Sequence, residues 1–399
     1  MMNARRRRRK REREDDQDEV PHMLVYTSEL RHLNSLFLQI IAIVIAVTTT
    51  LDAAYDSVTI LAHPIIPAVR LDLQNLDGLQ PEHLFRFSKD NLQTLIVCLR
   101  FPLIMHTSQR DRFWSIEGLC IVLRRLVYPV RYLDMVRRFG RSRASLSRIH
   151  RCVMAWIHNR WGHLSEFDIN RFTHVLPQWA TAVRRVAPNC YENVVMFLDG
   201  TVRQTCVPCP HPSNRPAGVT QYELQRAQYS NHKHYHGFKA HALIAPNGIC
   251  VHYFGPVDGR HHDSYLLHES GLYNDMRGLT IGDVDYQIYG DSAYPIHRNL
   301  VAPIPRNNAP PGSVAAVLNQ RMSVARTTTS EWWYGVITNT FQTLHFDRWQ
   351  RMWLTAPALQ YSVGMLLTNC RTCLQEGNRI SFFFQSSPPD LQTYLSGSF

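Results

Sequence analysis

Two aspartates stand where strand-forming residues meet a glycine. Asp199 follows the apolar run 194–198 and precedes Gly200, and Asp291 follows Gly290 at the end of the run 286–290. β-Branched and aromatic residues favour strands, and a carboxylate at the end of a strand can project past the sheet edge. Cleavage of a phosphodiester by two divalent ions needs carboxylates that converge from separate elements, and hard ions such as Mg²⁺ select oxygen ligands. Asp199 and Asp291 are therefore candidates for metal-dependent phosphodiester chemistry.

A third carboxylate is expected from a later helix, and Glu331 is placed to supply it. Thr329 or Ser330 could cap a helix that starts there, which puts Glu331 in the first turn. An acid in a first turn also complements the helix dipole. The position of Glu331 therefore has a structural explanation beside the catalytic one.

Four blocks of sequence around these acids resemble the catalytic domain of Harbinger-superfamily (PIF/Harbinger) transposases and their domesticated nuclease relatives. The blocks are Phe197-Leu198-Asp199-Gly200-Thr201, Gly259-Arg260-His261-His262-Asp263-Ser264, Gly290-Asp291-Ser292-Ala293-Tyr294-Pro295 and Arg326 … Glu331-Trp332-Trp333-Tyr334-Gly335, within a resemblance that covers about 85–372. The resemblance implies a DDE catalytic domain over 190–375, of α/β class, with an RNase H-like mixed sheet flanked by helices. It implies that Asp199, Asp291 and Glu331 form the catalytic triad and hold two Mg²⁺ or Mn²⁺ ions.

Asp263 matches a further acidic position that is typical of the family. One interpretation is that Asp263 contacts the metal directly. The other is that it caps the helix that begins with Ser264-Tyr265, or that it supports the metal ligands from a second layer. The sequence leaves both open and favours the second. In two further places the chain departs from the family pattern: 203–234 is longer than the family's usual loop, and Trp332-Trp333 replaces smaller residues.

Cysteine and histidine residues also cluster, but their spacing disfavours zinc. Cys206-x-x-Cys209 is followed by His211, whereas the second pair, Cys370-x-x-Cys373, lies far away in the sequence. A structural zinc site usually has two compact ligand pairs. The histidine-rich segment from His232 to Lys239 is better explained as a basic lead-in to a strand beside the active cleft, where Lys233 and Lys239 could contact DNA phosphates.

The segment 84–165 has the apolar spacing of helices, and it predicts an all-α, helix-turn-helix-like domain ahead of the sheet. Ser88 is a plausible N-cap, a second helix spans 115–126, and Gly140 joins helical runs at 133–139 and 142–156. In a helix-turn-helix the second helix enters the major groove. Arg143, Arg148 and Arg151 on that helix are therefore predicted to bind DNA, although an ordinary helical hairpin with a basic face remains the alternative.

Composition is consistent with a folded nucleic-acid-binding protein. The chain has 399 residues, 45% of them hydrophobic, and a formal net charge of +11. Lysine occurs at only four positions, so 39 of the 43 basic residues are arginine, whose planar fork of donors suits phosphate. The nine cysteines are scattered and odd in number, which favours a reducing compartment over a disulfide framework.

The two ends of the chain are assigned by composition. The segment 1–22 has a basic run at 5–11 followed by an acidic stretch, so it is predicted to be a disordered tail. The basic run fits a nuclear-import signal or an arm that grips phosphate, with a solvated tail as the alternative. The segment 23–83 is expected to be helical, with 36–51 a buried helix rather than a membrane span, and 376–399 is expected to be a C-terminal tail.

Two functions of different classes follow from these observations. The first is a nuclear, metal-dependent DNA endonuclease or transposase that cuts phosphodiester bonds through its acid triad. The alternative is a domesticated DNA-binding or chromatin-associated protein that keeps the fold without cutting. The intact set of acids favours the first. The resemblance adds a possible Myb-like DNA-binding partner protein, a homo-oligomer is possible, and no membrane contact is expected.

Overall fold

The computed structural model describes residues 71, 73, 76, 80–351 and 355–397. From residue 80 onward the described residues form one compact unit by their internal contacts. The predictions for the tail 1–22, for nearly all of 23–83 and for the apolar run 36–51 lie outside the described residues. No helix within the described part of the chain is both long enough and apolar enough to cross a membrane.

The centre of the unit is a mixed sheet of six strands in the order β10-β9-β3-β5-β4, and β6 also pairs with β5. β3 pairs antiparallel with β5, and β5 pairs antiparallel with β6, whereas β9 runs parallel to both β3 and β10. The strands span Val194–Gln204 (β3), Tyr229–Ser230 (β4), Tyr235–Ile244 (β5), Cys250–Asp258 (β6), Gln287–Tyr289 (β9) and Leu300–Val301 (β10). This confirms an α/β fold with a mixed sheet.

β5 and β6 form a β-hairpin. Gly248 closes the turn with φ +81°, a backbone conformation that costs glycine no steric strain. β3, however, does not end at Asp199, because its pairing with β5 continues as far as Gln204 opposite Gly237. The expectation that this strand terminates on the acid is therefore wrong.

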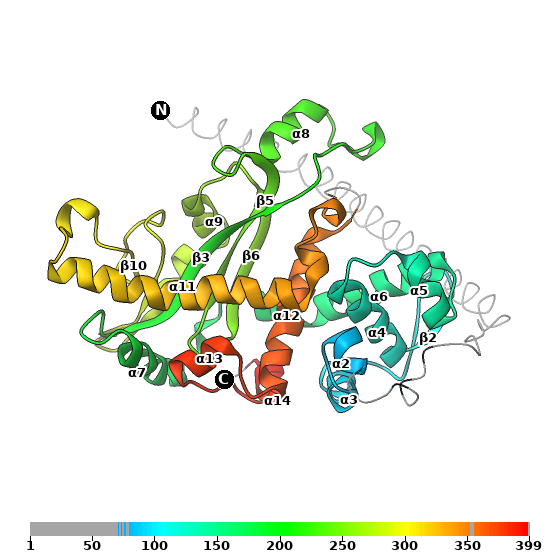
Figure 1. Ribbon diagram of the computed structural model, residues 1–399, viewed down its shortest axis with the longest axis horizontal. Helices are drawn as coiled ribbons and strands as arrows, with labels where there is room; N and C mark the ends of the chain where they lie inside the picture. Colours follow the sequence, from blue (N-terminus) through cyan, green and yellow to red (C-terminus); the bar gives the residue numbers. More distant parts are fainter. Residues whose placement is uncertain (1–70, 72, 74–75, 77–79, 352–354, 398–399) are drawn as a thin grey trace, which may run out of the picture. The chain divides into compact units, whose positions relative to one another are not determined.

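Helices cover the sheet. α7 (Leu176–Val186) and α11 (Val314–Thr340) pack against β3, α11 also contacts β5, and α12 (Pro357–Leu374) packs against β6. Figure 1 shows the long α11 running across the strands. The smaller elements are α8 (Gln221–Gln228), α9 (Asp263–Glu269), α10 (Leu272–Asp275) and the hairpin of β7 (Thr280–Ile281) with β8 (Val284–Asp285). The sheet is thus flanked by helices, as predicted.

A helical segment with one small hairpin precedes the sheet. Ser88 caps α3 by accepting a hydrogen bond from the backbone N–H of Asn91, and Gly140 ends α5 in the left-handed conformation with φ 62°. These two local signals are confirmed. The elements are α2 (Gln80–Phe85), α3 (Lys89–Cys98), β1 (Ile104–His106), β2 (Arg112–Trp114), α4 (Ser115–Val127), α5 (Tyr132–Phe139) and α6 (Arg143–Trp161). Their apolar side chains join those of the sheet in one core.

The segment expected to be a C-terminal tail is folded over most of its length. It forms α13 (Arg379–Phe384) and α14 (Leu391–Ser396). Asn378 and Asp390 cap these helices with their side chains, and Phe384 and Leu395 are buried. The prediction of a tail is wrong, because well-capped helices form in this segment and bury their apolar residues.

Candidate active site

The register of two neighbouring strands places Asp199 and Asp291 side by side. Phe197 of β3 lies opposite Tyr289 of β9 in a parallel pair. Asp199 lies two residues after Phe197, and Asp291 lies two residues after Tyr289. Residues two apart along a strand point to the same face. Asp199 lies within β3 and Asp291 lies in the loop just beyond β9. The structure therefore brings these two predicted acids together from separate strands.

Asp199 is largely enclosed. Its side chain is 14% exposed, and its Oδ2 lies 3.3 Å from Nη1 of Arg326 on α11. Tyr334 lies eight residues beyond Arg326 on α11, and its hydroxyl donates a hydrogen bond to the backbone oxygen of Asp199 at 3.0 Å. Burial raises the pKa of Asp199 to about 6, and while Arg326 opposes this shift, the charges of Asp291 and Asp263 add to it. At neutral pH the carboxylate is ionised among other acids.

Asp263 is the third acid at this place. A Cβ built on Gly200 would lie 2.1 Å from Oδ1 of Asp263, so the Asp263 carboxylate rests against the backbone beside Asp199. The same oxygen lies 3.0 Å from Nζ of Lys239, an ion pair that lacks hydrogen-bond alignment. Lys239 also donates to the backbone oxygen of His261 at 3.2 Å. Asp263 begins α9, and His262 is its N-cap, so the expectation that Asp263 caps the helix is wrong.

A buried tyrosine hydroxyl faces the three acids. Tyr294 is 3% exposed, and its hydroxyl has no hydrogen-bond partner among the described residues. Burial raises the pKa of Tyr294, and the charges of Asp263, Asp199 and Asp291 raise it further. A buried hydroxyl without a partner costs free energy. Tyr294 is therefore a donor directed at whatever lies among the acids.

Glu331 is not among the charges that shift the pKa of Asp199. α11 begins at Val314 with Ser313 as its N-cap, so the prediction that Glu331 stands in a first turn is wrong. The hydroxyls of Thr329 and Ser330 do not cap a helix but donate back to the carbonyls of the preceding turn, at 2.6 and 3.0 Å. Glu331 is five residues beyond Arg326, about 140° around the helix, and its side chain is exposed.

The chemistry of the cluster suits a hard divalent cation, although the side chains are not arranged as a closed site. Asp199, Asp263 and Asp291 offer only oxygen ligands, which Mg²⁺ and Mn²⁺ accept, and their charges interact. The unpartnered hydroxyl of Tyr294 fits a neighbour that carries water. Within the part of the chain that the structure describes, no three acidic, histidine or cysteine side chains stand close enough to hold a metal ion as they are. Arg326 and Lys239 neutralise two of the acids instead.

Comparison with known protein families indicates which class of enzyme this domain resembles. Residues 205–357 match the family model described as DDE superfamily endonuclease. The match covers less than half of the 399 residues, and it includes Asp263, Asp291 and Glu331 but begins after Asp199. No curated protein and no solved structure matches the chain. The mixed sheet flanked by helices is consistent with a DDE nuclease fold, and such endonuclease domains generally use divalent metal ions.

Sequence reasoning missed two side chains that the structure brings to the acid cluster. Arg326 was noted only as part of a motif, and Tyr294 only as a neighbour of Asp291. Asp199 is more than ninety residues from both, and Asp263 is more than thirty residues from Tyr294, so no local pattern could have found these contacts. Lys239 was proposed as a phosphate contact, and it lies at the cluster. Lys233 is exposed in the turn before β5 and has no contact with the cluster among those described.

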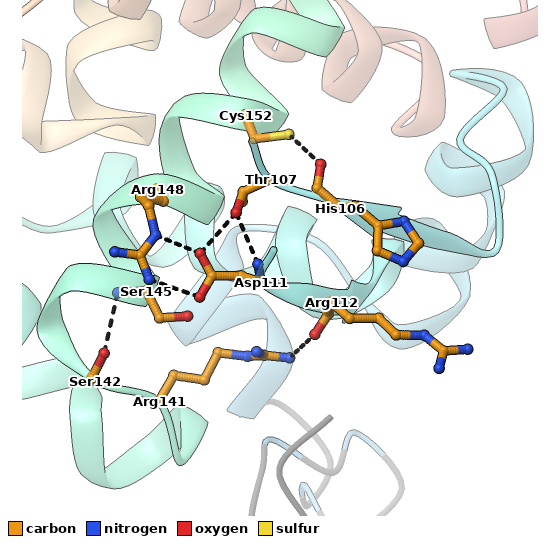
Figure 2. Close-up of polar contacts among 9 residues, drawn as sticks. All are labelled: His106, Thr107, Asp111, Arg112, Arg141, Ser142, Ser145, Arg148 and Cys152. Atoms are coloured by element: carbon orange, nitrogen blue, oxygen red, sulfur yellow. Dashed lines mark hydrogen bonds and ion pairs between the residues drawn. The ribbon is translucent and has the colours of Figure 1, made fainter. Parts of the chain in front are cut away.

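The three arginines proposed for DNA differ in their surroundings. Arg143 and Arg151 are exposed on α6. Arg148 instead binds Asp111 through two hydrogen bonds, one of 2.5 Å from Nε and one of 2.8 Å from Nη2. Figure 2 shows this pair beside Thr107, whose hydroxyl donates to Asp111 at 2.8 Å. Arg148 therefore joins α6 to the loop between β1 and β2, and its guanidinium is already engaged.

The Asp111–Arg148 pair predicts a pH-dependent contribution to stability. The hydrogen bond from Arg148 lowers the pKa of Asp111 from 3.8 to about 2. A lowered folded-state pKa stabilises the protein above the unfolded value, and this stabilisation is lost as the pH falls from about 4 towards 2. We expect Asp111→Asn to lower the free energy of unfolding by about 1–2 kcal/mol at pH 7. The difference from the parent should shrink in urea titrations at pH 3.

The control for this prediction is an ion pair of the same type at the surface. Arg131 and Asp134 on α5 are 72% and 43% exposed, and such pairs contribute little. Asp134→Asn should therefore change the free energy of unfolding by less than Asp111→Asn at neutral pH. Equal losses for the two variants would contradict the assigned role of Arg148.

Proposed function

We propose that the chain is a metal-dependent DNA endonuclease of the transposase type, with an RNase H-like catalytic domain. The observation that carries the proposal is the convergence of Asp199, Asp291 and Asp263 from β3, the loop after β9 and the start of α9. The match to DDE superfamily endonucleases over 205–357 supports it independently. The mixed sheet, in which β3 is antiparallel to β5 and parallel to β9, also supports it.

The roles of the residues follow from their positions. Asp199 and Asp291 would hold divalent cations, two in the proposed mechanism, and Asp263 or Glu331 would supply a third carboxylate. Bound cations would neutralise the charge that develops on the phosphate during cleavage. Arg326 and Lys239 lie within ion-pair distance of the acids. They are therefore placed to bind phosphate oxygens once bound cations neutralise the acids in their stead.

A plasmid-nicking assay tests the proposal. The parent protein should nick supercoiled DNA in Mg²⁺ or Mn²⁺ and not in EDTA. Asp199→Asn keeps the shape of the side chain but removes its charge, so nicking should fall by a factor of at least about 100. The matched control is Asp283→Asn, which changes an exposed aspartate in the turn between β7 and β8. Equal activity of Asp199→Asn and the parent would refute the proposed site.

The same assay ranks the two candidates for the third carboxylate. Asp263 already lies against the backbone beside Asp199, whereas Glu331 is exposed on α11. If Glu331 completes the triad, Glu331→Gln should lose as much activity as Asp199→Asn. If Asp263 does so, the large loss should belong to Asp263→Asn.

A DNA-binding protein that does not cut is the second candidate. The specific observation in its favour is that Arg326 and Lys239 already neutralise Asp199 and Asp263, while the side chain of Glu331 is exposed. Metal-independent DNA binding without nicking, in the parent protein, would favour this candidate. Entry into the nucleus through the run 5–11, a Myb-like partner and a homo-oligomer stay predictions.

We further propose that α6 contacts DNA phosphates through Arg143 and Arg151. Replacing both with alanine should weaken DNA binding and reduce the slope of log K against log salt by up to about 1.8, since each lost phosphate contact removes about 0.9. Arg184→Ala, an exposed arginine on α7, is the control. An unchanged slope in the double variant would exclude α6 from the interface.

A further inference from the structure

A polar pocket of about 470 Å³ lies beside α8, outside the acid cluster. α8 is the helix at the top of Figure 1. Half-buried His236 lines the pocket from β5, and none of its seven described lining residues is acidic. The others include two tyrosines, two arginines and two amides: Tyr222, Tyr229, Arg226, Arg260, Gln225 and Asn231.

Local structure holds these side chains in place. Thr220 and Glu223 form a capping box that starts α8. At the other end of α8, the backbone N–H of Arg260 donates to the carbonyl of Ala227 at 3.3 Å. Gly259 makes this approach possible, because a Cβ there would lie 2.7 Å from the carbonyl oxygen of Gln228. The loop after β6 is thus fastened to α8, and Arg260 is carried to the pocket.

The lining has the chemistry that recognises a nucleotide. Tyr222 is 71% exposed, so one face of its ring is free to stack. The rings of Tyr229 and His236 lie 5.2 Å apart, edge to face. Bases stack on aromatic side chains whatever their sequence, amides hydrogen-bond to base edges, and arginine forks bind phosphate. A pocket without acids and with two arginines suits an anion that also carries a flat ring.

The pocket is connected to the proposed active site by one short loop. Arg260 lines the pocket and Asp263 belongs to the acid cluster, three residues further along. Three residues span at most about 11 Å, which is about three nucleotide steps of a duplex strand at 3.4 Å each. A strand that lies with one phosphate at the acids can therefore reach the pocket with a neighbouring nucleotide.

We propose that this pocket binds one unpaired nucleotide of the DNA strand next to the cleaved bond, with its base stacked on Tyr222 and its phosphate on Arg260. The proposal rests on the proposed nuclease function, and it adds the substrate class: DNA that is unpaired, or becomes unpaired, near the cut. Such a site selects forks, overhangs and opened ends over continuous duplex.

Binding measured without metal tests this directly. The probes are a short blunt duplex labelled with fluorescein and the same duplex with an unpaired arm of a few nucleotides, one of them 2-aminopurine, both in EDTA. The parent should bind the armed duplex more tightly, and 2-aminopurine fluorescence should be quenched by stacking. Tyr222→Ala should weaken binding of the armed duplex about tenfold and restore the fluorescence, with little effect on the blunt duplex.

Two further variants make the result specific. Arg260→Ala should lower affinity for the armed duplex, and Arg260→Lys, which keeps the charge but loses the fork, should recover part of it. Phe382→Ala removes an aromatic ring of similar exposure, 68%, from α13, which lies at the other end of the sheet in Figure 1. This control should bind both probes as the parent does.

The possible outcomes separate the two proposals. Equal losses on both probes in Tyr222→Ala, or no loss on either, would overturn the nucleotide pocket. A loss of affinity confined to the armed duplex supports the pocket. It does so even if Asp199→Asn leaves nicking unchanged, because unchanged nicking would refute only the nuclease. Conversely, nicking that depends on Asp199 would stand if the pocket failed.

Discussion

Mn²⁺ should raise the melting temperature of the parent protein by several degrees and that of Asp291→Asn by much less, and the same variant should lose metal-dependent cleavage. Asp199 lies on β3 and Asp291 just beyond the end of the neighbouring strand β9, and their charges interact. Without a bound cation these charges repel one another, so a cation stabilises the folded state by linkage. At a concentration 100 times its dissociation constant, it would add about 2.7 kcal/mol.

The asparagine variant separates the loss of metal from the loss of the fold. Asparagine keeps the size of the side chain and the oxygen that accepts from the backbone N–H of Ser292, a hydrogen bond of 2.6 Å in the parent. In EDTA the variant should therefore melt at or slightly above the temperature of the parent, because one of the repelling charges is gone. DNA binding without metal should be retained.

The control for this experiment is Asp283→Asn, whose melting temperature should respond to Mn²⁺ as the parent does. Equal metal-induced shifts in the parent and in Asp291→Asn would show that the cation binds elsewhere. A parent that neither shifts with metal nor cleaves DNA would favour the DNA-binding protein over the nuclease.

Arg141→Ala should lower the free energy of unfolding by about 3–5 kcal/mol. Arg141 and Glu117 form an ion pair in which each side chain is only 3% exposed. Nη2 of Arg141 donates to Glu117 at 2.9 Å and to the carbonyl of Arg112 at 3.0 Å, and Figure 2 shows the second of these bonds. Truncating the arginine leaves the Glu117 carboxylate buried without its partner, which is costly.

The pair joins the turn between α5 and α6 to α4 and β2, so the same variant should also loosen the predicted helix-turn-helix. Urea titration gives the free energy, and the slope reports whether the whole unit still unfolds together. Arg138→Ala, an exposed arginine on α5, should have little effect.

A double variant checks the physical reason for this large effect. Replacing both partners with methionine removes both buried charges and keeps apolar volume, so Arg141→Met with Glu117→Met should regain much of the stability lost in Arg141→Ala. A double variant as unstable as the single one would mean that the arginine acts through its packing or its bond to Arg112 rather than by neutralising Glu117.

The sequence by itself determined the elements whose signals are local. Ser88 as a cap, Gly140 in the left-handed turn and Gly248 in the β-hairpin each act within a few residues, so their positions could be predicted. The strands ahead of Asp199 and Asp291 could also be predicted, because β-propensity is a local property of the sequence.

Only the tertiary structure decided what surrounds the acids. β3 continues past Asp199 because β5 pairs with it, and α11 starts seventeen residues before Glu331 because Ser313, not Ser330, is its cap. The partners of the acids, Arg326 and Lys239, come from a distant helix and a neighbouring strand. Hydroxyl residues cap a helix or bond back to its preceding turn with equal ease, so the sequence around Thr329 and Ser330 could not say which. The tertiary structure decides between these two roles, because burying α11 against the sheet requires an unbroken helix there.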